Sequence, residues 1–365
     1  MTWTSEFSLR ESHARKRTLS AVLGAILLLC GGGCGHSSSE TAADDASGPL
    51  FPVPINGAAG FINDRGRVVI PARFENALPF SEGLAAVMHE GRWGYIDRSG
   101  KEAIPYLFQT AESFHAGVAI VNTGLPEHPV GLIDPNGAWV IRPSFRFITA
   151  ADGPNGILLA QKEPGEKPTF YDRTGNRALG PYHQAFPFAQ DRARVKNDAD
   201  EWIIDSTGSF LPKKSVFLDA THYSDGMIAV RGNGKVGYMD LDGQIAIEPR
   251  YDAGGAFAEG LAPVQMNGRW SFIDKSGATV AQLPEGVVFA LPLSDGLSLV
   301  TADVGQAAKK LGYVDKEGKW AVKPVWDDAQ PFCDGLAYVG IWKGEVAAYI
   351  NRKGKRVWEG HSAPQ

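Results

Sequence analysis

Carboxylates are the side chains of this chain whose types and spacing could do chemistry. The densest group lies between Asp191 and Glu201, in the stretch DRARVKNDADE. Two carboxylates held at a fixed separation would suit acid–base cleavage of a glycosidic bond. The same stretch is also typical of a polar hairpin turn, which is the simpler interpretation. We therefore expect a protein that is not an enzyme, with a glycan-active enzyme on a β-repeat scaffold as the alternative.

A second set of acidic residues recurs before a glycine along the chain. Its members are Glu82, Asp225, Glu259, Asp295 and Asp334. Stacked repeats would place them along one face, either as a solvated stripe or as a site for cations or a basic partner. With 36 Lys and Arg against 41 Asp and Glu, the net charge of −5 argues against a nucleic-acid partner, whose binding requires a basic surface. The sequence predicts no cofactor and no metal site.

Tryptophan is the other residue type that suggests a function, because its ring stacks on sugars and anchors protein partners. The candidates for partner binding are Trp139, Trp202, Trp320 and Trp342. The alternative is that these rings belong to the core or cap the ends of the fold. Partner binding therefore stays a hypothesis for these four residues.

These residues must be positioned by a repeated element. An acidic or amide residue follows a pair of aromatic or apolar residues nine times, each time with a glycine three residues later. The nine residues are Asn63, Asp97, Asp134, Asp172, Asp205, Asp240, Asp274, Asp315 and Asn351. Successive copies are 33 to 41 residues apart, with a mean spacing of 36, which falls in the range of repeat proteins.

Each unit predicts a β-hairpin, as in the apolar runs Leu84 to Met88 and Trp93 to Asp97. The acidic residue can accept hydrogen bonds within its own turn, and the following glycine takes a positive φ. Gly94 opens its strand where a neighbouring chain must approach closely. A proline further on, such as Pro105, is expected to end the strand because it lacks an N–H donor.

Long helical periodicity is absent, so residues 50–358 are predicted to be an all-β repeat domain. We expect nine hairpins in a curved, solenoid-like array. The alternative is a closed, β-propeller-like ring. Propeller blades usually have about 40–45 residues and number about four to eight, so the ring is the less favoured of the two.

The N-terminal region has the features of an export signal. Basic residues precede an apolar run of 11 residues, Leu19 to Leu29, which is too short to span a bilayer. Residues 1–33 are predicted to be a lipoprotein-type signal peptide, 34–49 a flexible tether without large apolar residues, and 359–365 a C-terminal tail. Cys34, preceded by a glycine, resembles the lipidated cysteine of bacterial lipoproteins, with Cys30 as the alternative. Cleavage without lipidation would leave a soluble, secreted or periplasmic protein.

The string GRWGYIDRSGK at 91–101, together with FSEGLA at 80–85, resembles the WG repeat of bacterial proteins. The resemblance covers residues 50–358 and is degenerate between 131 and 216. It implies an extracytoplasmic or interaction role and no particular reaction. The resulting expectation is a non-catalytic cell-envelope lipoprotein, anchored to a membrane by its N-terminal lipid, that binds a protein or glycan partner or serves as a scaffold.

Overall fold

The computed structural model describes residues 48–361, except 128, 151–152, 198–199, 212–216, 219–221, 306–307 and 342–345. Cys34, Trp342, the leader and the end of the tail therefore lie outside the described residues. Residues Thr41–Gln365 form one compact unit. Apart from the single 3₁₀ turn η2 (Pro154–Gly156), every helix or strand in the described part is a strand, which confirms the all-β prediction.

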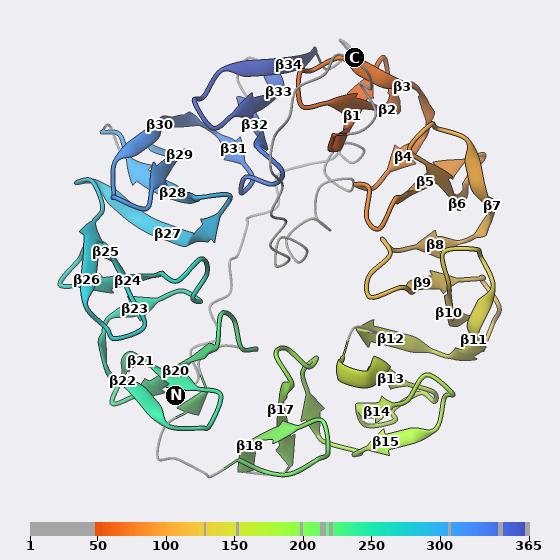
Figure 1. Ribbon diagram of the computed structural model, residues 1–365, viewed down its shortest axis with the longest axis horizontal. Coiled ribbons are helices and arrows are strands. Elements are labelled where there is room, and N and C mark those ends of the chain that lie inside the picture. Colours follow the sequence, from red (N-terminus) through yellow and green to blue (C-terminus); the bar gives the residue numbers. More distant parts are fainter. Residues whose placement is uncertain are drawn as a thin grey trace, which may run out of the picture. The chain divides into compact units, whose positions relative to one another are not determined.

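The strands of the described residues form nine small antiparallel sheets, here called blades 1 to 9 (Figure 1). Blade 1 contains β1 (Leu50–Ile55), β2 (Ala58–Asn63) and β3 (Val68–Phe74). Blade 2 contains β4 (Asn76–Ala77), β5 (Leu84–His89), β6 (Arg92–Asp97) and β7 (Glu102–Phe108). Blade 3 contains β8 (Thr110–Ala111), β9 (Ala119–Asn122), β10 (Val130–Ile133) and β11 (Trp139–Phe145). Blade 4 contains β12 (Phe147–Ala150), β13 (Leu158–Gln161), β14 (Thr169–Tyr171) and β15 (Arg177–Leu179).

The remaining blades follow the same order. Blade 5 contains β16 (Gln184–Ala185), β17 (Arg192–Asn197) and β18 (Asp200–Asp205). Blade 6 contains β19 (Phe217–Leu218), β20 (Met227–Gly232), β21 (Lys235–Asp240) and β22 (Ile245–Tyr251). Blade 7 contains β23 (Ala253–Gly254), β24 (Ala262–Met266), β25 (Arg269–Ile273) and β26 (Thr279–Gln282). Blade 8 contains β27 (Val287–Ser294), β28 (Leu297–Asp303), β29 (Lys309–Asp315) and β30 (Trp320–Trp326). Blade 9 contains β31 (Asp328–Ala329), β32 (Leu336–Ile341), β33 (Val346–Asn351) and β34 (Arg356–His361).

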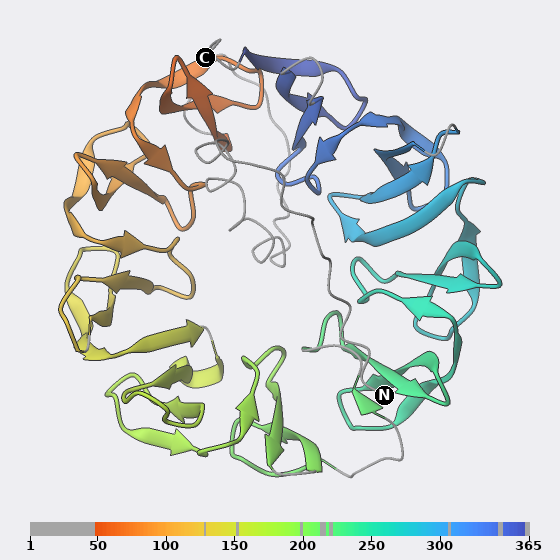
Figure 2. The same cartoon turned by 180° about the vertical axis from the view of Figure 1, so that it is seen from behind.

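A complete blade has four strands, which we call a to d in chain order. In blade 2 these are β4, β5, β6 and β7, each hydrogen-bonded to the next. Strand a lies toward the centre of the ring and strand d at its circumference (Figures 1 and 2). The predicted hairpin is the b–c pair. Its turn, Glu90-Gly91, has two positive φ angles, 49° and 72°, which match the twist of the flanking strands.

The predicted turn between strands c and d is confirmed. The Asp97 carboxylate accepts hydrogen bonds from the N–H groups of Ser99 (2.9 Å) and Lys101 (3.0 Å), and Gly100 has φ +82°. The prediction that proline ends the strand is wrong, because β7 continues through Pro105. Strand d is the outermost strand, and its pairing to strand c shifts register on either side of Tyr95, so a missing N–H is tolerated there.

Blades pack on one another through aromatic pairs. The aromatic residue of strand c contacts a phenylalanine in the a–b turn of the next blade, as in Tyr95–Phe114, whose ring centroids are 4.9 Å apart. The Tyr95 hydroxyl also donates to the Glu112 carbonyl at 2.8 Å. The same pairs recur as Phe61–Phe80, Phe170–Phe188, Tyr238–Phe257 and Tyr313–Phe332. The core of the domain therefore lies between blades.

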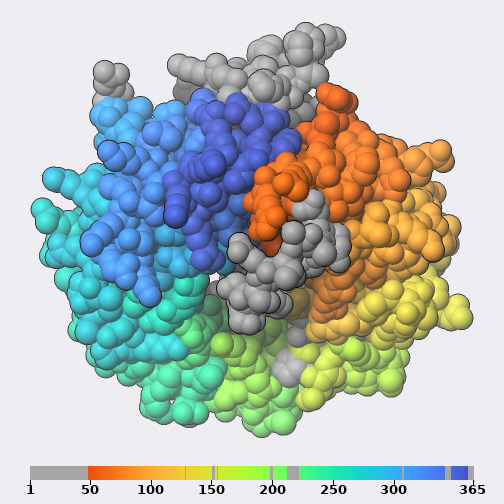
Figure 3. All heavy atoms as spheres, turned by 45° about the horizontal axis from the view of Figure 1, so that its top comes forward, coloured from red at the N-terminus to blue at the C-terminus, as the bar shows by residue number. Residues whose placement is uncertain are grey.

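The blades close into a ring, so the prediction of an open array is wrong and the alternative, a propeller, is right. Blade 9 contacts blade 1 directly (Figure 3). The rings of Phe51 and Tyr349 lie 5.5 Å apart, and the Tyr349 hydroxyl donates to the Pro52 carbonyl at 3.1 Å. Val53 and Leu336 belong to the same buried cluster. A mean spacing of 36 residues suffices for a four-stranded blade because strand a is often only two residues long, as in β4.

The junction between blades 9 and 1, here called the seam, is built differently from the other blade contacts. Within the described residues blade 1 has no strand a, so the inner edge of β1 has no sheet neighbour. In blade 2 the two carbonyls that face strand a belong to Ala86 and Met88, which accept from Leu78 and Glu75. The residues of β1 at these positions are Pro52 and Pro54.

The seam residues compensate for the missing strand. Because proline has no N–H group, Pro52 and Pro54 leave no unpaired donor on the inner edge of β1. This protects the edge from pairing with other chains. Phe51 stands where five other blades have alanine, and it fills the space beside Tyr349. The five alanines are Ala85, Ala119, Ala193, Ala262 and Ala337. The ring is therefore closed by side chains and not by a shared sheet.

Candidate functional site

The candidate site is one face of the ring, here called the turn face, which carries the a–b and c–d turns. The first residue of strand b, Leu84, pairs with the last residue of strand c, Asp97. Because this pairing repeats in the other blades, such as Leu297 with Asp315, both kinds of turn emerge on the same side of every blade. The b–c turns lie on the opposite face.

The acidic residues of the a–b turns do line this face, and they bind the next blade. Glu82 in blade 2 accepts a hydrogen bond from the backbone N–H of Gly117 in blade 3, at 3.0 Å. Four further blade pairs repeat this contact. They are Gln190 with Gly226 (2.7 Å), Asp225 with Gly260 (2.7 Å), Glu259 with Gly296 (3.0 Å) and Asp295 with Gly335 (2.6 Å). These side chains therefore serve blade-to-blade contacts.

A basic residue in the c–d turn of the same next blade adds an ion pair to two of these contacts. Lys275 of blade 7 pairs with Asp225 at 2.8 Å, and Arg352 of blade 9 pairs with Asp295 at 3.2 Å. Partial burial alone would raise the pKa of Asp225. The Lys275 ammonium and the Gly260 N–H outweigh it and hold this pKa below its usual value. The ionised carboxylate is therefore the form that joins the blades.

Replacing Asp225 with asparagine should lower the free energy of unfolding by about 1 kcal/mol at neutral pH, because a partly exposed charged contact is lost. A folded-state pKa below the unfolded value stabilises the protein above the unfolded pKa. This contribution is lost as the pH falls through the folded pKa. The difference between the two proteins should therefore shrink below about pH 4, in urea denaturation followed by tryptophan fluorescence.

Asp334 provides a matched control within the same repeat position. In the next blade, Pro49 stands at the position of the glycine that donates to the other acids, and it has no N–H to offer Asp334. We expect the Asp334→Asn variant to unfold at the same urea concentration as the unaltered protein. An equal loss of stability in both variants would contradict a specific role for the Asp225 contact.

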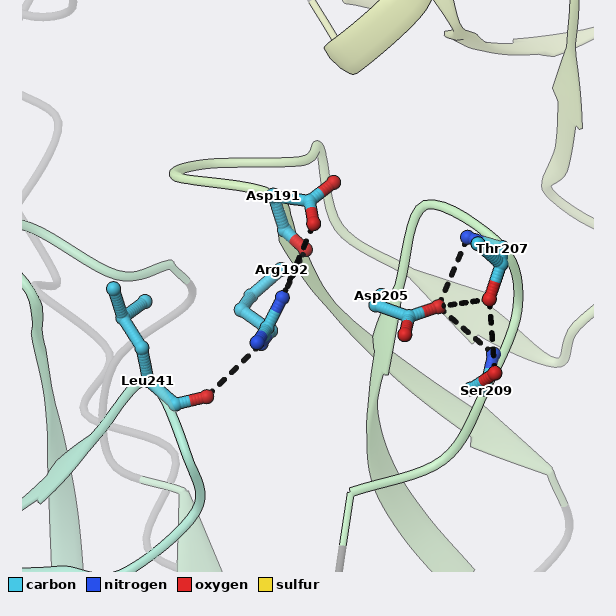
Figure 4. Close-up of polar contacts among 6 residues, drawn as sticks. All are labelled: Asp191, Arg192, Asp205, Thr207, Ser209 and Leu241. Atoms are coloured by element: carbon cyan, nitrogen blue, oxygen red, sulfur yellow. Dashed lines mark hydrogen bonds and ion pairs between the residues drawn. The ribbon is translucent and has the colours of Figure 1, made fainter.

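The acidic cluster from Asp191 to Glu201 folds as the hairpin β17–β18, which confirms the simpler interpretation. Asp191 pairs with Arg192 at 3.2 Å (Figure 4), and Glu201 with Arg194 at 2.5 Å. The Arg192 guanidinium also donates to the Leu241 carbonyl of blade 6 at 3.0 Å (Figure 4). Asp198 lies outside the described residues.

Figure 4 also shows a c–d turn of this region in detail. The Asp205 carboxylate accepts from the N–H and hydroxyl of Thr207, at 2.9 and 2.6 Å, and from the N–H of Ser209 at 3.0 Å. The Thr207 hydroxyl contact lowers the pKa of Asp205 below its ordinary value, with smaller contributions from the backbone donors. This carboxylate organises its own turn.

The tryptophans predicted to bind a partner lie on different blades. Trp139 and Trp320 are the first residues of strand d in blades 3 and 8 and are half-buried. Trp139 packs on Phe108 of the preceding blade, with ring centroids 6.2 Å apart. Trp202, on strand c of blade 5, is half-buried and contacts Phe210 at 5.3 Å. The fold therefore does not bring these rings together, and Trp342 lies outside the described residues.

Two open depressions mark the turn face. One of about 490 Å³ lies in blade 9 beside the seam and is lined by Asp334, Gly335, Asn351, Arg352 and Lys353. The other, of about 460 Å³, is bordered by residues of blades 7 and 8, including Glu259 and Lys316. Within the described part of the chain, no three His, Cys, Asp or Glu side chains are grouped as metal ligands, and no helix is long and apolar enough to cross a membrane.

Sequence reasoning did not identify the seam. Its signal was present in the sequence, because Phe51 replaces a recurring alanine and two prolines follow within three residues. Reasoning from the sequence also found no cluster of basic residues, because the cluster forms only when the two ends of the domain meet.

Four segments of the chain match the family described as "WG containing repeat": residues 60–93, 93–124, 237–270 and 312–341. The chain carries WG repeats. The first WG repeat runs from strand c of blade 1 to strand c of blade 2, so each repeat spans the contact between two blades. All four WG matches lie outside the region between 131 and 216, where the sequence pattern is degenerate.

Solved structures similar to this WG-repeat ring are diverse. A crystal structure of "the eukaryotic initiation factor" has a TM-score of 0.60 at 11% identity, covering 87% of this chain and 96% of that chain. Dihydro-heme d1 dehydrogenase NirN has a TM-score of 0.45 at 12% identity, covering 89% and 75%. AztD of Citrobacter koseri has a TM-score of 0.41 at 14% identity, covering 87% and 95%. The first of these likenesses concerns the fold alone. No curated protein matches the sequence.

Proposed function

We propose that the chain is an exported, lipid-anchored protein of the bacterial cell envelope whose ring is a non-catalytic binding or scaffold module for a protein or glycan partner. The observation that carries this proposal is that the recurring acidic side chains bind the neighbouring blade. Acids such as Asp225 and Asp295 hold one blade to the next. These contacts stabilise the ring, and its turn face is the surface proposed for the partner.

The location follows from the N-terminal sequence. A basic leader, an apolar run of 11 residues and the Gly-preceded Cys34 occur in the order of a lipoprotein signal. Residues 35–47 contain no apolar side chain larger than alanine, which suits a tether between a lipid and the ring.

Mass spectrometry of the mature N-terminus should find a diacylated Cys34 as the first residue. The Cys34→Ser variant should lose the acyl chains and leave the membrane fraction. Acylation of Cys30 would move the cleavage site by four residues and keep the anchored protein. An unmodified N-terminus further along, near Asp44, would overturn the lipid anchor and favour the soluble form.

The binding role is tested by photo-crosslinking in cells. A photoreactive amino acid at Ser276, exposed on the turn face in blade 7, should capture a discrete partner, whereas one at Lys323, exposed on the outer strand β30, should not. Equal capture at both positions, or none at either, would contradict the turn face as the binding surface. Release of sugar products from envelope glycan by the purified protein would contradict the non-catalytic role.

A further inference from the structure

Basic side chains gather on the turn face on both sides of the seam. The nine c–d turns of the described residues contain eleven Lys and Arg residues, and seven of these belong to the three consecutive blades 9, 1 and 2. Six of the seven are exposed; Arg352 pairs with Asp295, and the other five define what we call the seam patch. They are Arg65, Arg67, Lys101, Lys353 and Lys355. Ring closure assembles this patch, because Lys353 and Arg65 come from opposite ends of the domain.

The charge balance around the seam differs from that of the rest of the chain. Exposed acidic residues on the same turns and their flanks are Asp64, Glu82, Glu102 and Asp334. The five cations of the seam patch therefore face four exposed anions here, although the whole chain has a net charge of −5. The c–d turn of blade 6, by comparison, carries Asp242 and no basic residue. The basic residues of the c–d turns are therefore concentrated at the seam.

The tether joins the ring at the same place. Gly48 precedes β1 by two residues and occupies the position that Glu82 has in the a–b turn of blade 2. The Arg98 guanidinium of blade 2 donates to the Gly48 carbonyl, which holds the incoming chain against the turn face. The chain therefore enters the ring between the turns that carry the seam patch.

The length of the tether sets how far this face lies from a membrane. Thirteen residues separate Cys34 from Gly48. A chain of this length can span at most about 45 Å. A surface potential of anionic lipids acts over about 10 Å, which the tether allows the seam patch to reach.

We propose that the seam patch binds anionic phospholipid headgroups and turns the seam side of the ring toward the membrane. This inference rests on the proposed lipid anchor. The acyl chains would hold the protein at the membrane without orienting the ring, whereas each basic side chain near an anionic bilayer adds about 1 kcal/mol of attraction on its own side. The seam patch supplies that attraction next to the tether, and the remainder of the turn face is left for a partner.

The test uses protein comprising residues 35–365 without acyl chains, so that binding depends on the ring and tether alone. This part folds by itself because its buried clusters lie within residues 50–358. It should sediment with vesicles that contain phosphatidylglycerol, remain in solution with pure phosphatidylcholine vesicles, and dissociate at high salt. The variant Arg65→Gln/Lys353→Gln/Lys355→Gln should lose about fivefold in affinity for each charge removed.

The matched control removes three charges from the opposite face. Arg92, Arg269 and Lys309 are exposed there, and their replacement by glutamine changes the net charge equally. The control should bind vesicles as tightly as the unaltered protein. Equal losses in both variants, or no sedimentation with phosphatidylglycerol vesicles, would overturn the proposal. Binding to duplex DNA in place of vesicles would overturn it as well.

The two proposals fail in different ways. An unmodified Cys34 would remove the lipid anchor without changing the vesicle result. A diacylated Cys34 combined with absent vesicle binding would leave the anchor intact and overturn only the seam patch.

Discussion

Replacing Phe51 with alanine is expected to lower the free energy of unfolding by about 3–5 kcal/mol, the usual loss for a buried phenylalanine. Phe51 is 8% exposed and packs on Tyr349 at the seam. Urea denaturation followed by circular dichroism measures this change. The Leu107→Ala variant is the control, because Leu107 is 66% exposed on the outer strand β7 and its loss should leave stability nearly unchanged.

The same measurement tests ring closure. If the blades formed an open array, Phe51 and Tyr349 would lie at opposite ends, and a Phe51→Ala variant would lose little. In the ring, the effects of Phe51→Ala and Tyr349→Ala should be strongly non-additive because the two rings share one interface. Additive effects in a double-mutant cycle would contradict closure through these side chains.

The second large effect is expected at Gly94. An added Cβ at this position would lie 2.7 Å from the Ile104 carbonyl oxygen and 2.9 Å from the Pro105 carbonyl carbon. These are backbone atoms of strand d, so the strand itself must move. We expect the Gly94→Ala variant to lose about 3 kcal/mol of stability, as overpacked sites do. The thermal unfolding midpoint of the full chain measures the loss.

Gly48 is the matched control for this substitution, since an added Cβ there would meet no atom within 4 Å. Gly48→Ala should therefore unfold at the temperature of the unaltered protein. Four other blades support the assignment, because an added Cβ at Gly60, Gly131, Gly237 or Gly312, which occupy the same position, would also lie within 3 Å of backbone atoms of strand d. A stable Gly94→Ala variant would show that strand d can give way without cost.

Local features of the fold could be predicted from the sequence because they depend on neighbouring residues. The Asp97 turn and the close approach at Gly94 each follow from the chemistry of a few consecutive positions. Closure depends on contacts between residues almost 300 positions apart, such as Tyr349 with Pro52. The repeat pattern of the sequence does not indicate such a contact. The usual number of propeller blades, about four to eight, argued against a closed ring of nine.

The site was less predictable than the fold. The acidic stripe was recognised, but its partners are backbone N–H groups of the next blade, such as that of Gly260, which leave no signature in the sequence. The tryptophans were selected by residue type alone, and the Trp139 ring packs on Phe108 of the neighbouring blade. The seam patch combines turns from both ends of the domain, so it becomes visible only once the ring is closed.

The open inner edge of β1 has a mechanical consequence for a protein held by a tether. Load applied through the tether enters the ring at β1, which is hydrogen-bonded to β2 on one side and, among the described strands, meets none on the other. The Tyr349 hydroxyl and the Phe51 ring connect this strand to blade 9. Under tension the ring should therefore yield at the seam first, and the blades with four strands should follow only after it has opened.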